Sequence, residues 1–188
     1  MAEEYRPSWR DRVRRRSRRA VLARLRSWVE PNGTRLLDLG GGTGVTTTVF
    51  GDGARERVVL EPNEKRILQG RKAHAPVTFV VGVAEAVPYE EGRFDRVVSL
   101  MSFHHFSDGP KACREAARVL APGGRFVVYD LDRSPSPARL AAFWVMRVRH
   151  RKMRLLSSAE LEQVVRDAGF QNVRREPFGG GAFVVGER

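Results

Sequence analysis

The chain has 188 residues and a formal net charge of +12, and 41% of its residues are hydrophobic. This composition excludes a disordered chain and predicts a single domain with a sizeable core. The single cysteine, Cys113, excludes an internal disulfide framework and indicates a reducing compartment. No apolar run approaches the roughly 18 residues of a membrane-spanning helix, and no secretory signal is recognised, so we expect a cytoplasmic protein.

The positive charge is concentrated near the N-terminus and in one later segment. Residues 5–28 contain ten arginines against one acid, and residues 138–156 add five arginines and Lys152 without an acid. Apolar residues of the first segment recur at helical steps, which is typical of a helix with one apolar face. We therefore expect residues 1–30 to form a basic amphipathic helix that serves as a lid or an interaction arm.

Three partners for this helix stay open. An anionic membrane surface, the phosphates of a nucleic acid and the helix's own domain would each accept such a helix. Packing against its own domain is the preferred interpretation of the apolar stripe. An arginine-rich genome would raise the net charge without any partner.

Strand and helix patterns alternate along the rest of the chain. The expected strands are Thr34–Leu39, Arg57–Leu60, Val77–Val81, Phe94–Leu100, Arg125–Leu131, Val173–Pro177 and Ala182–Gly186. The expected helices are a short one from Val45, then 63–74 with Asn63 as N-cap, Pro110–Leu120, and a helix ending at Ala168 that Ser157 or Ser158 caps. This alternation predicts an α/β domain with a doubly wound parallel sheet.

Two segments interrupt the alternation. Ala121–Gly124 is expected to form a tight turn before the fifth strand. Residues 132–156 read as an inserted basic segment, with an apolar-basic helix expected at Ala138–Arg149. The main domain is therefore expected to span residues 31–188.

A glycine-rich turn follows the first strand, at the edge where open parallel sheets bind ligands. Asp38 ends that strand, and Gly40, Gly42 and Gly44 follow in the sequence DLGGGTG. Glycines let the backbone turn sharply and approach a ligand closely. Glu61, about twenty residues further on, would accept hydrogen bonds from both hydroxyls of a ribose.

The spacing within this turn separates two kinds of nucleotide site. Dinucleotide sites favour G-x-G-x-x-G, which places a pyrophosphate on a helix N-terminus, whereas this turn has G-x-G-x-G with Asp38 before it. A carboxylate there disfavours a pyrophosphate and suits a cationic or amino-bearing ligand. S-adenosylmethionine carries a sulfonium, an ammonium and a ribose without a phosphate, so it fits this pattern better than a nicotinamide dinucleotide.

Four motifs resemble one known family. Leu36–Gly44 is similar to the first motif of class I S-adenosylmethionine-dependent methyltransferases, and Phe94–Ser99 to their fourth-strand motif. Arg118–Arg125 resembles their RVLKPGG turn. Ser102–Phe106 resembles the LHHF stretch of the type 11 branch, which includes quinone-biosynthesis C-methyltransferases. The resemblance covers residues 34–131 and implies a Rossmann-like, seven-stranded sheet whose last strand is antiparallel.

The resemblance also implies which residues bind the cofactor. They are Asp38, Gly40, Gly42 and Gly44 for the methionine part, Glu61 with Pro62 after it for the ribose, Ala84 and Glu85 for the adenine, and Ser99 and Met101 beside the transferable methyl group. One position departs from the family, which commonly has an aspartate where this chain has Val83. Valine cannot accept the hydrogen bond from the adenine amino group, and losing such a bond costs about 0.5–1.5 kcal/mol. We therefore expect weaker cofactor binding.

Two adjacent histidines are the candidate catalytic residues. His104 and His105 follow the fourth strand beside the expected methyl position, and imidazole titrates near neutral pH. One of them, with His104 the first choice, is expected to be a general base; the alternative is that the histidine caps a helix or packs against the cofactor. Tyr129 and Asp130 are candidates for bonding a substrate hydroxyl. No cluster has the spacing of a zinc site, so no metal is expected.

The sequence thus predicts an S-adenosylmethionine-dependent methyltransferase that acts on a small-molecule acceptor of apolar or anionic character. Two other functions stay open. One is an RNA-associated methyltransferase that uses the arginine-rich helix, and the other is a non-catalytic cofactor-binding protein. The acceptor atom and the oligomeric state are not determined by the sequence.

Overall fold

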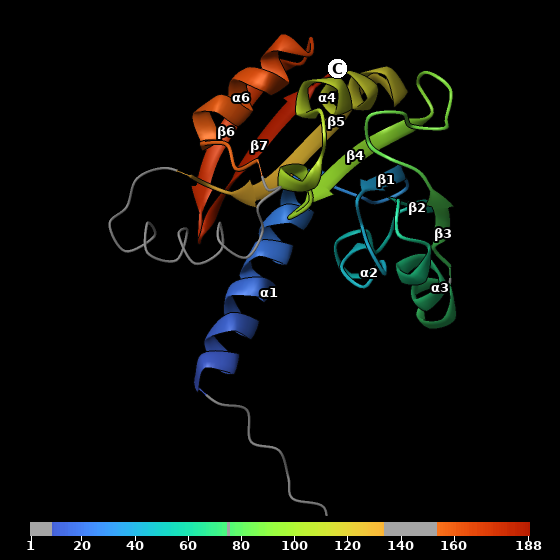
Figure 1. Cartoon of the computed structure of the whole chain (residues 1–188), viewed down its shortest axis with the longest axis vertical. Helices are drawn as coiled ribbons and strands as arrows, with labels where there is room; N and C mark the ends of the chain where they lie inside the picture. Colours follow the sequence, from blue (N-terminus) through green and yellow to red (C-terminus); the bar gives the residue numbers. More distant parts are fainter. Residues whose placement is uncertain (1–8, 75, 134–153) are drawn as a thin grey trace, which may run out of the picture.

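The computed structural model describes residues 9–74, 76–133 and 154–188, which form one seven-stranded sheet. The strand order is β3-β2-β1-β4-β5-β7-β6 (Figure 1). β7 runs antiparallel to β5 and β6, whereas the pairs on the β3 side are parallel. The expected fold class, a Rossmann-like doubly wound sheet with an antiparallel last strand, is confirmed.

The elements follow the expected alternation. The strands are β1 (Arg35–Leu39), β2 (Glu56–Glu61), β3 (Thr78–Val81), β4 (Phe94–Leu100), β5 (Leu120–Leu131), β6 (Gln171–Phe178) and β7 (Gly181–Glu187). The helices are α1 (Trp9–Val29), α2 (Thr47–Phe50), α3 (Glu64–Ala73), the 3-10 helix η1 (Phe103–His105), α4 (Gly109–Val119) and α6 (Ser158–Asp167). The helix expected at Ala138–Arg149 lies outside the described residues.

One local prediction was wrong. Ala121–Gly124 does not form a turn ahead of the fifth strand but lies inside β5, which begins at Leu120. Leu120 already pairs with Phe94, and the register then shifts before the regular pairing of β4 with β5 resumes. Both of these side chains are fully buried, so burial of the apolar pair keeps the start of β5 in the sheet and the glycines form a bulge.

Two predicted helix caps are confirmed. The Asn63 side chain accepts hydrogen bonds from the backbone N–H groups of Lys65 and Arg66, so α3 begins directly after the end of β2. Ser157 and Glu160 form a reciprocal capping box at the start of α6.

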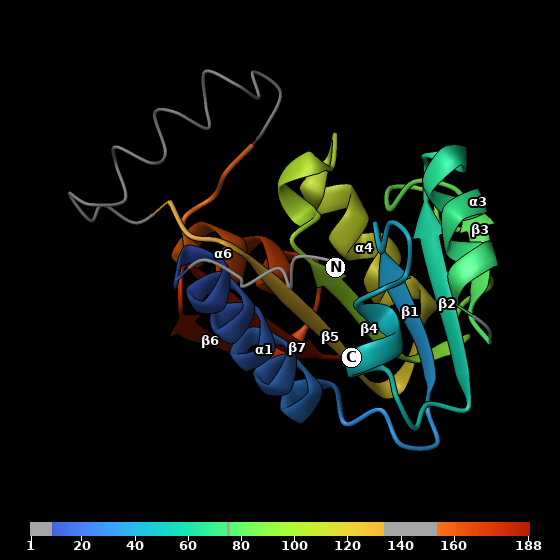
Figure 2. The ribbon, with the colours of Figure 1, turned by 90° about the horizontal axis from the view of Figure 1, so that it is seen from below.

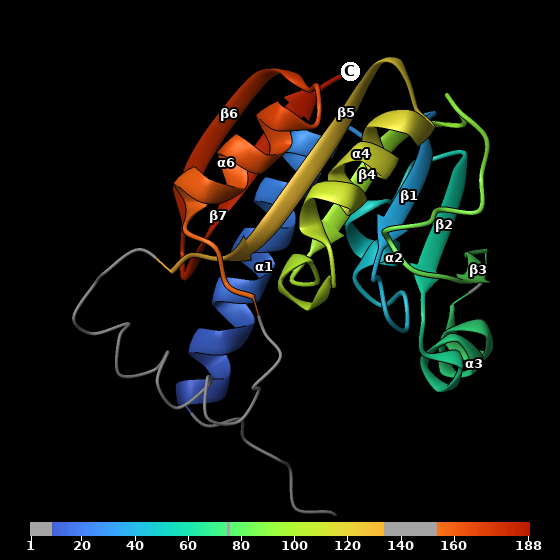
Figure 3. The ribbon, with the colours of Figure 1, turned by 45° about the horizontal axis from the view of Figure 1, so that its top comes forward.

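Helices cover both faces of the sheet (Figures 2 and 3). α1 and α2 pack against one face with Leu36 and Val98, and α4 and α6 pack against the other with Leu37 and Val97. This alternation follows the period of two along a strand. Within the described ranges, no helix combines the length and apolarity needed to span a bilayer.

The C-terminal part of α1 packs against its own domain. Leu25 and Val29 are fully buried in the core beneath the helix. Arg96 donates to the Val29 carbonyl at 2.6 Å, and Arg125 donates to the Trp28 carbonyl at 2.7 Å. Cations at the last carbonyls of a helix satisfy orphan acceptors and oppose the negative end of the helix dipole. The other end of α1 extends past the sheet (Figure 1).

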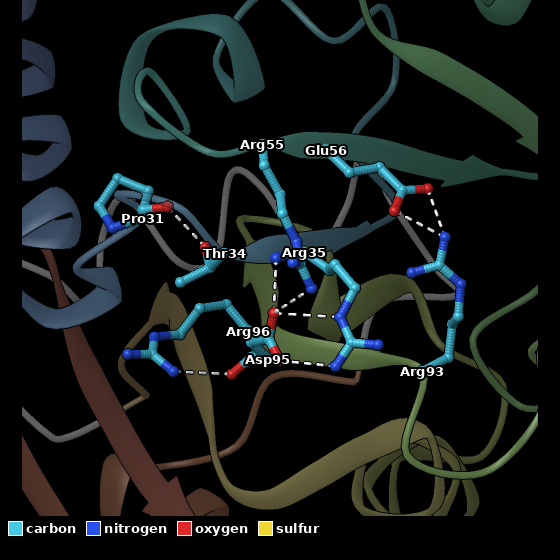
Figure 4. Close-up of polar contacts among 8 residues, drawn as sticks. All are labelled: Pro31, Thr34, Arg35, Arg55, Glu56, Arg93, Asp95 and Arg96. Atoms are coloured by element: carbon cyan, nitrogen blue, oxygen red, sulfur yellow. Dashed lines mark hydrogen bonds and ion pairs between the residues drawn. The ribbon is translucent and has the colours of Figure 1, made fainter.

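A carboxylate joins β1 to β4 at the amino ends of these strands (Figure 4). Asp95 accepts hydrogen bonds from the Arg35 guanidinium at 2.7 and 3.1 Å and from the Arg35 backbone N–H at 2.8 Å. Arg55 lies 3.8 Å away. The Arg35 bonds lower the pKa of Asp95 from 3.8 to about 2, against the opposing effect of burial. The ion pairs of Asp95 with arginines therefore stabilise this end of the sheet.

Candidate active site

A cavity of about 620 Å³ opens at the carboxyl ends of β1, β2 and β4. Six of the ten residues predicted to bind cofactor line it, namely Gly40, Glu61, Pro62, Ala84, Glu85 and Met101. Asn63, Arg66, Ser102, Phe106 and Ser107 also line it, and sequence reasoning assigned none of them to the cofactor. Its volume lies within the range of small-molecule sites.

The glycine turn has the backbone conformation that its sequence predicts. Gly40 and Gly44 both have φ +73°, a region that side-chain-bearing residues rarely adopt. A Cβ on Gly40 would lie 2.7 Å from the Ser102 Cβ, and one on Gly44 would lie 2.8 Å from the Phe79 ring. Glycine is therefore required at both positions by the packing of the turn against Ser102 and Phe79, and Gly40 also lines the cavity.

Glu61 is held at the end of β2 by backbone donors. Its side chain is almost fully buried, and its carboxylate accepts hydrogen bonds from the N–H groups of Gly42 and Asn63, each at 3.1 Å. A carboxylate has about four acceptor positions, so these two bonds leave capacity for the two hydroxyls of a ribose. The glycine turn therefore orients Glu61, the residue that is predicted to bind the ribose.

Asp38 lies beneath the same turn in a different electrostatic state. Its side chain is buried, Thr47 donates to Oδ2 at 2.5 Å, and Oδ1 has no hydrogen-bond partner among the described residues. Burial raises the pKa of Asp38 from 3.8 to about 7; the Thr47 bond lowers it and the charge of Glu61 raises it further. A cationic group bound nearby would stabilise the charged form, so this orphan oxygen fits the cationic end of S-adenosylmethionine.

The wall on the predicted adenine side contains the departure from the family. Val83 lines the cavity and is 45% exposed. Neighbouring Glu85 accepts three hydrogen bonds, from the backbone N–H and hydroxyl of Ser107 and the N–H of Asp108. Burial opposes ionisation of Glu85, but these bonds outweigh it and lower its pKa. Glu85 therefore fixes the loop that starts α4 besides contributing to the wall.

Ser99 and Met101, both predicted to lie beside the transferable methyl group, are found at the end of β4, the first buried and the second exposed. Ser99 is fully buried and bonds the Ser102 hydroxyl at 2.8 Å, and Ser102 donates to the Leu39 carbonyl at 2.7 Å. Met101 lies in the cavity wall with φ +55°, and its N–H donates to the Tyr129 carbonyl at 2.8 Å. Ser99 thus holds the glycine turn to β4, while Met101 contacts the cavity.

The two histidines of η1 lie in different surroundings. His105 is exposed and lines the cavity, whereas His104 is buried and does not belong to its lining. The His104 Nδ1 lies 2.6 Å from an Asp130 carboxylate oxygen, and its backbone N–H donates to the other oxygen at 3.0 Å. Tyr129 is also buried, and its hydroxyl donates to the Phe178 carbonyl at 3.2 Å. The sequence indicated neither contact, because each joins segments far apart along the chain.

Comparison with known proteins agrees with this geometry. A family model described as "Methyltransferase domain" matches residues 2–175. The mitochondrial 2-methoxy-6-polyprenyl-1,4-benzoquinol methylase of Leishmania donovani is 29% identical, over 79% of this chain and 66% of its own. The ubiquinone/menaquinone biosynthesis C-methyltransferase UbiE of Dinoroseobacter shibae is 34% identical, over 62% of this chain and 50% of its own. The crystal structure of the YcgJ protein from Bacillus subtilis superimposes with a TM-score of 0.73 at 27% identity, covering 84% of this chain and 70% of that one.

The chain therefore belongs to the class I S-adenosylmethionine-dependent methyltransferases, in the branch that contains the quinone-biosynthesis enzymes. It spans only 40% to 66% of the length of the curated relatives that it matches. The cofactor of this class is S-adenosylmethionine. The acceptor capacity of Glu61 fits its ribose, and the Asp38 oxygen that lacks a hydrogen-bond partner among the described residues fits its cationic end.

Proposed function

We propose that this chain transfers a methyl group from S-adenosylmethionine to a small-molecule acceptor. The observations that carry the proposal are Glu61 in the cavity wall and Asp38 buried beneath the adjoining glycine turn, outside that wall. Glu61 has capacity for a vicinal diol, and Asp38 has a buried oxygen that a cation would satisfy. The names of the quinone-methylating relatives support a small-molecule acceptor.

The chain's contribution to the reaction is mainly alignment. When bound, S-adenosylmethionine supplies an electrophilic methyl on sulfur, and the electron pair of the broken carbon–sulfur bond stays on the leaving thioether. Glu61 would hold the ribose of the donor, the buried Asp38 beneath the glycine turn would favour its cationic end, and Met101 lines the cavity on the side of β4. Holding two reactants in line removes the entropic cost of their encounter.

We assign the proton transfer to His105 rather than His104. His105 lines the cavity, so its imidazole is in reach of an acceptor that loses a proton as its new bond to carbon forms. His104 is held by Asp130 through two hydrogen bonds and is best described as the residue that fixes η1.

Calorimetric titration with S-adenosylmethionine and S-adenosylhomocysteine, with NADH as the control, tests the cofactor assignment first. Micromolar binding of the sulfur compounds and none of NADH is expected. Mass-spectrometric detection of S-adenosylhomocysteine in an acceptor screen then tests the activity. Failure of both sulfur compounds to bind would overturn the proposal.

Substitution of the histidines tests the assigned base. His105→Ala is expected to lower the rate of methyl transfer by about 100-fold or more while leaving cofactor affinity unchanged. The matched control is His74→Ala, at the C-terminal end of α3. A rate loss in His104→Ala alone, with normal thermal stability, would reverse the assignment.

We further propose that the amino-terminal half of α1 is a lid over the acceptor side and that the protein is cytoplasmic. Ser17 and Arg18, in this half of α1, line a cavity together with Leu100 and Met101 at the end of β4, which supports a lid. A nucleic acid or an anionic membrane as partner of this helix predicts binding that falls steeply with salt. Titration of duplex RNA and of anionic vesicles at low and high salt tests both partners.

A further inference from the structure

A second cavity, of about 360 Å³, lies beside the cofactor site. Met101 lines both cavities, so a molecule in the second one would meet a donor in the first at this residue. The other described lining residues are Ser17, Arg18, Val21 and Leu22 of α1, Thr46, Leu100 at the end of β4, and Tyr129 of β5. The linings of both cavities include residues at the carboxyl ends of strands, Glu61 of β2 in the first and Leu100 of β4 in the second. α1 passes beyond this end of the sheet (Figure 1).

The interior of this second cavity is apolar. Val21, Leu22 and Leu100 pack against the core of the α1 face. Tyr129 is buried, and its hydroxyl is engaged by the Phe178 carbonyl. Ser17 and Thr46 add two hydroxyls to the lining, but most of the wall is apolar, so it favours a ligand with an apolar body over one that is polar throughout.

Among the described residues, the lining of the cavity contains one cation and no carboxylate. Arg18 lines the cavity, is exposed, and forms no ion pair within the described part of the chain. Other arginines of the same helix have fixed partners: Arg24 is paired with Glu176 at 2.6 Å, and Arg26 donates to the Asp52 carbonyl at 2.6 Å. The cation of Arg18 is therefore available to a ligand, unlike those nearer the C-terminal end of α1.

We propose that this cavity binds the methyl acceptor and that the acceptor is an apolar acid. Its hydrophobic body would lie against Val21, Leu22 and Tyr129, its anionic group would pair with Arg18, and its reacting atom would lie at Met101. Arg18 is then the residue that selects for charge, and α1 is part of the acceptor site. This inference rests on the methyltransferase function proposed above.

The test compares acids with their neutral analogues on the full chain. The probes are hydroxyaryl carboxylates, such as 4-hydroxyphenylacetate, and the matching carboxamides, each titrated in the presence of S-adenosylhomocysteine. Acids are expected to bind at least about 10-fold more tightly than amides, the effect of one charge-assisted hydrogen bond. Arg18→Gln should abolish this preference. The matched control Arg19→Gln, which changes the next exposed arginine outside the cavity lining, should retain it.

A second variant tests the location independently of charge. Val21→Trp would fill the cavity, and it should abolish binding of acids and amides alike while S-adenosylhomocysteine binds as before. An equal loss in Arg18→Gln and Arg19→Gln would overturn the proposal in favour of a general positive field. Equal binding of acids and amides would overturn it as well, because the site would then not select for charge. If the cofactor product itself fails to bind the unmodified chain, the methyltransferase function fails; if it binds and the acids do not, only the acceptor inference fails.

Discussion

Two aspartates on neighbouring strands show how differently the two ends of the sheet are built. Asp95, at the amino end of β4, has its charge neutralised by Arg35, and its pKa falls to about 2. Asp38, at the carboxyl end of β1, is buried with one oxygen unbonded, and its pKa rises to about 7. The Asp95 carboxylate stabilises the fold. The charged form of Asp38 is destabilised by burial, and a cationic ligand nearby would offset this effect. The contrast indicates that stability and binding are assigned to opposite edges of one sheet.

The largest expected effect concerns binding at the carboxyl edge. Glu61→Gln keeps the size of the side chain but removes the charge that would accept two ribose hydroxyls. We expect the affinity for S-adenosylmethionine to fall by about 100-fold, or roughly 2–3 kcal/mol, measured by calorimetry. The control is Arg66→Gln, whose guanidinium lies 3.9 Å from Glu61 in the same wall. An unchanged affinity in Glu61→Gln would remove the ribose assignment.

The next effect concerns stability at the amino edge. Because the pKa of Asp95 is lower in the folded chain than its ordinary 3.8, its contribution is complete above that pH and is lost as the pH falls towards about 2. Asp95→Asn should lower the free energy of unfolding by about 2 kcal/mol at pH 7, measured in urea. The two proteins should converge in stability at low pH, and cofactor affinity should not change. A loss of binding in this variant would show that the two edges are coupled.

Asp38→Asn should have the opposite effect on stability. The folded-state pKa of about 7 exceeds the ordinary 3.8, so the native protein binds this proton more tightly, and stability falls as the pH rises from about 4 to 7. The variant should lose this slope and gain about 1 kcal/mol or more at pH 8, since one pKa unit corresponds to about 1.4 kcal/mol. Its affinity for S-adenosylmethionine should fall by about 10-fold. Thermal unfolding across pH, with Asp95→Asn in parallel, measures the difference; a destabilised Asp38→Asn at pH 8 would contradict it.

The smallest effect restores a hydrogen bond on the adenine side. Val83→Asp introduces an acceptor on the exposed wall and should tighten binding of S-adenosylmethionine by about 2- to 10-fold, the net effect of one hydrogen bond to a solvent-exposed carboxylate. Val81→Asp is the control, because Val81 is similarly exposed at the end of β3 but does not line the cavity. Equal improvement in both variants would indicate a general electrostatic effect.

Much of the carboxyl edge was predictable because its signals are local. A run of apolar residues, an acid and closely spaced glycines determine a strand and a turn within a few residues, whatever the rest of the chain does. The positions of Asp38, Gly40 and Glu61 follow from the parallel order of β1 and β2. The bulge at Ala121–Gly124 was missed because it depends on Leu120 pairing with Phe94, a contact between distant segments.

The sequence by itself determined the fold class and the family and singled out six of the residues that line the cavity, because periodicity and turn chemistry act over short distances. The tertiary structure decided burial and charge pairing, because these depend on contacts between residues that are far apart in the sequence. It buried His104 against Asp130 and left His105 in the cavity wall. It also engaged Arg24 with Glu176 while leaving Arg18 at the mouth of a second cavity. Burial and charge pairing arise only when the chain is folded, and they distinguish residues that look alike in the sequence.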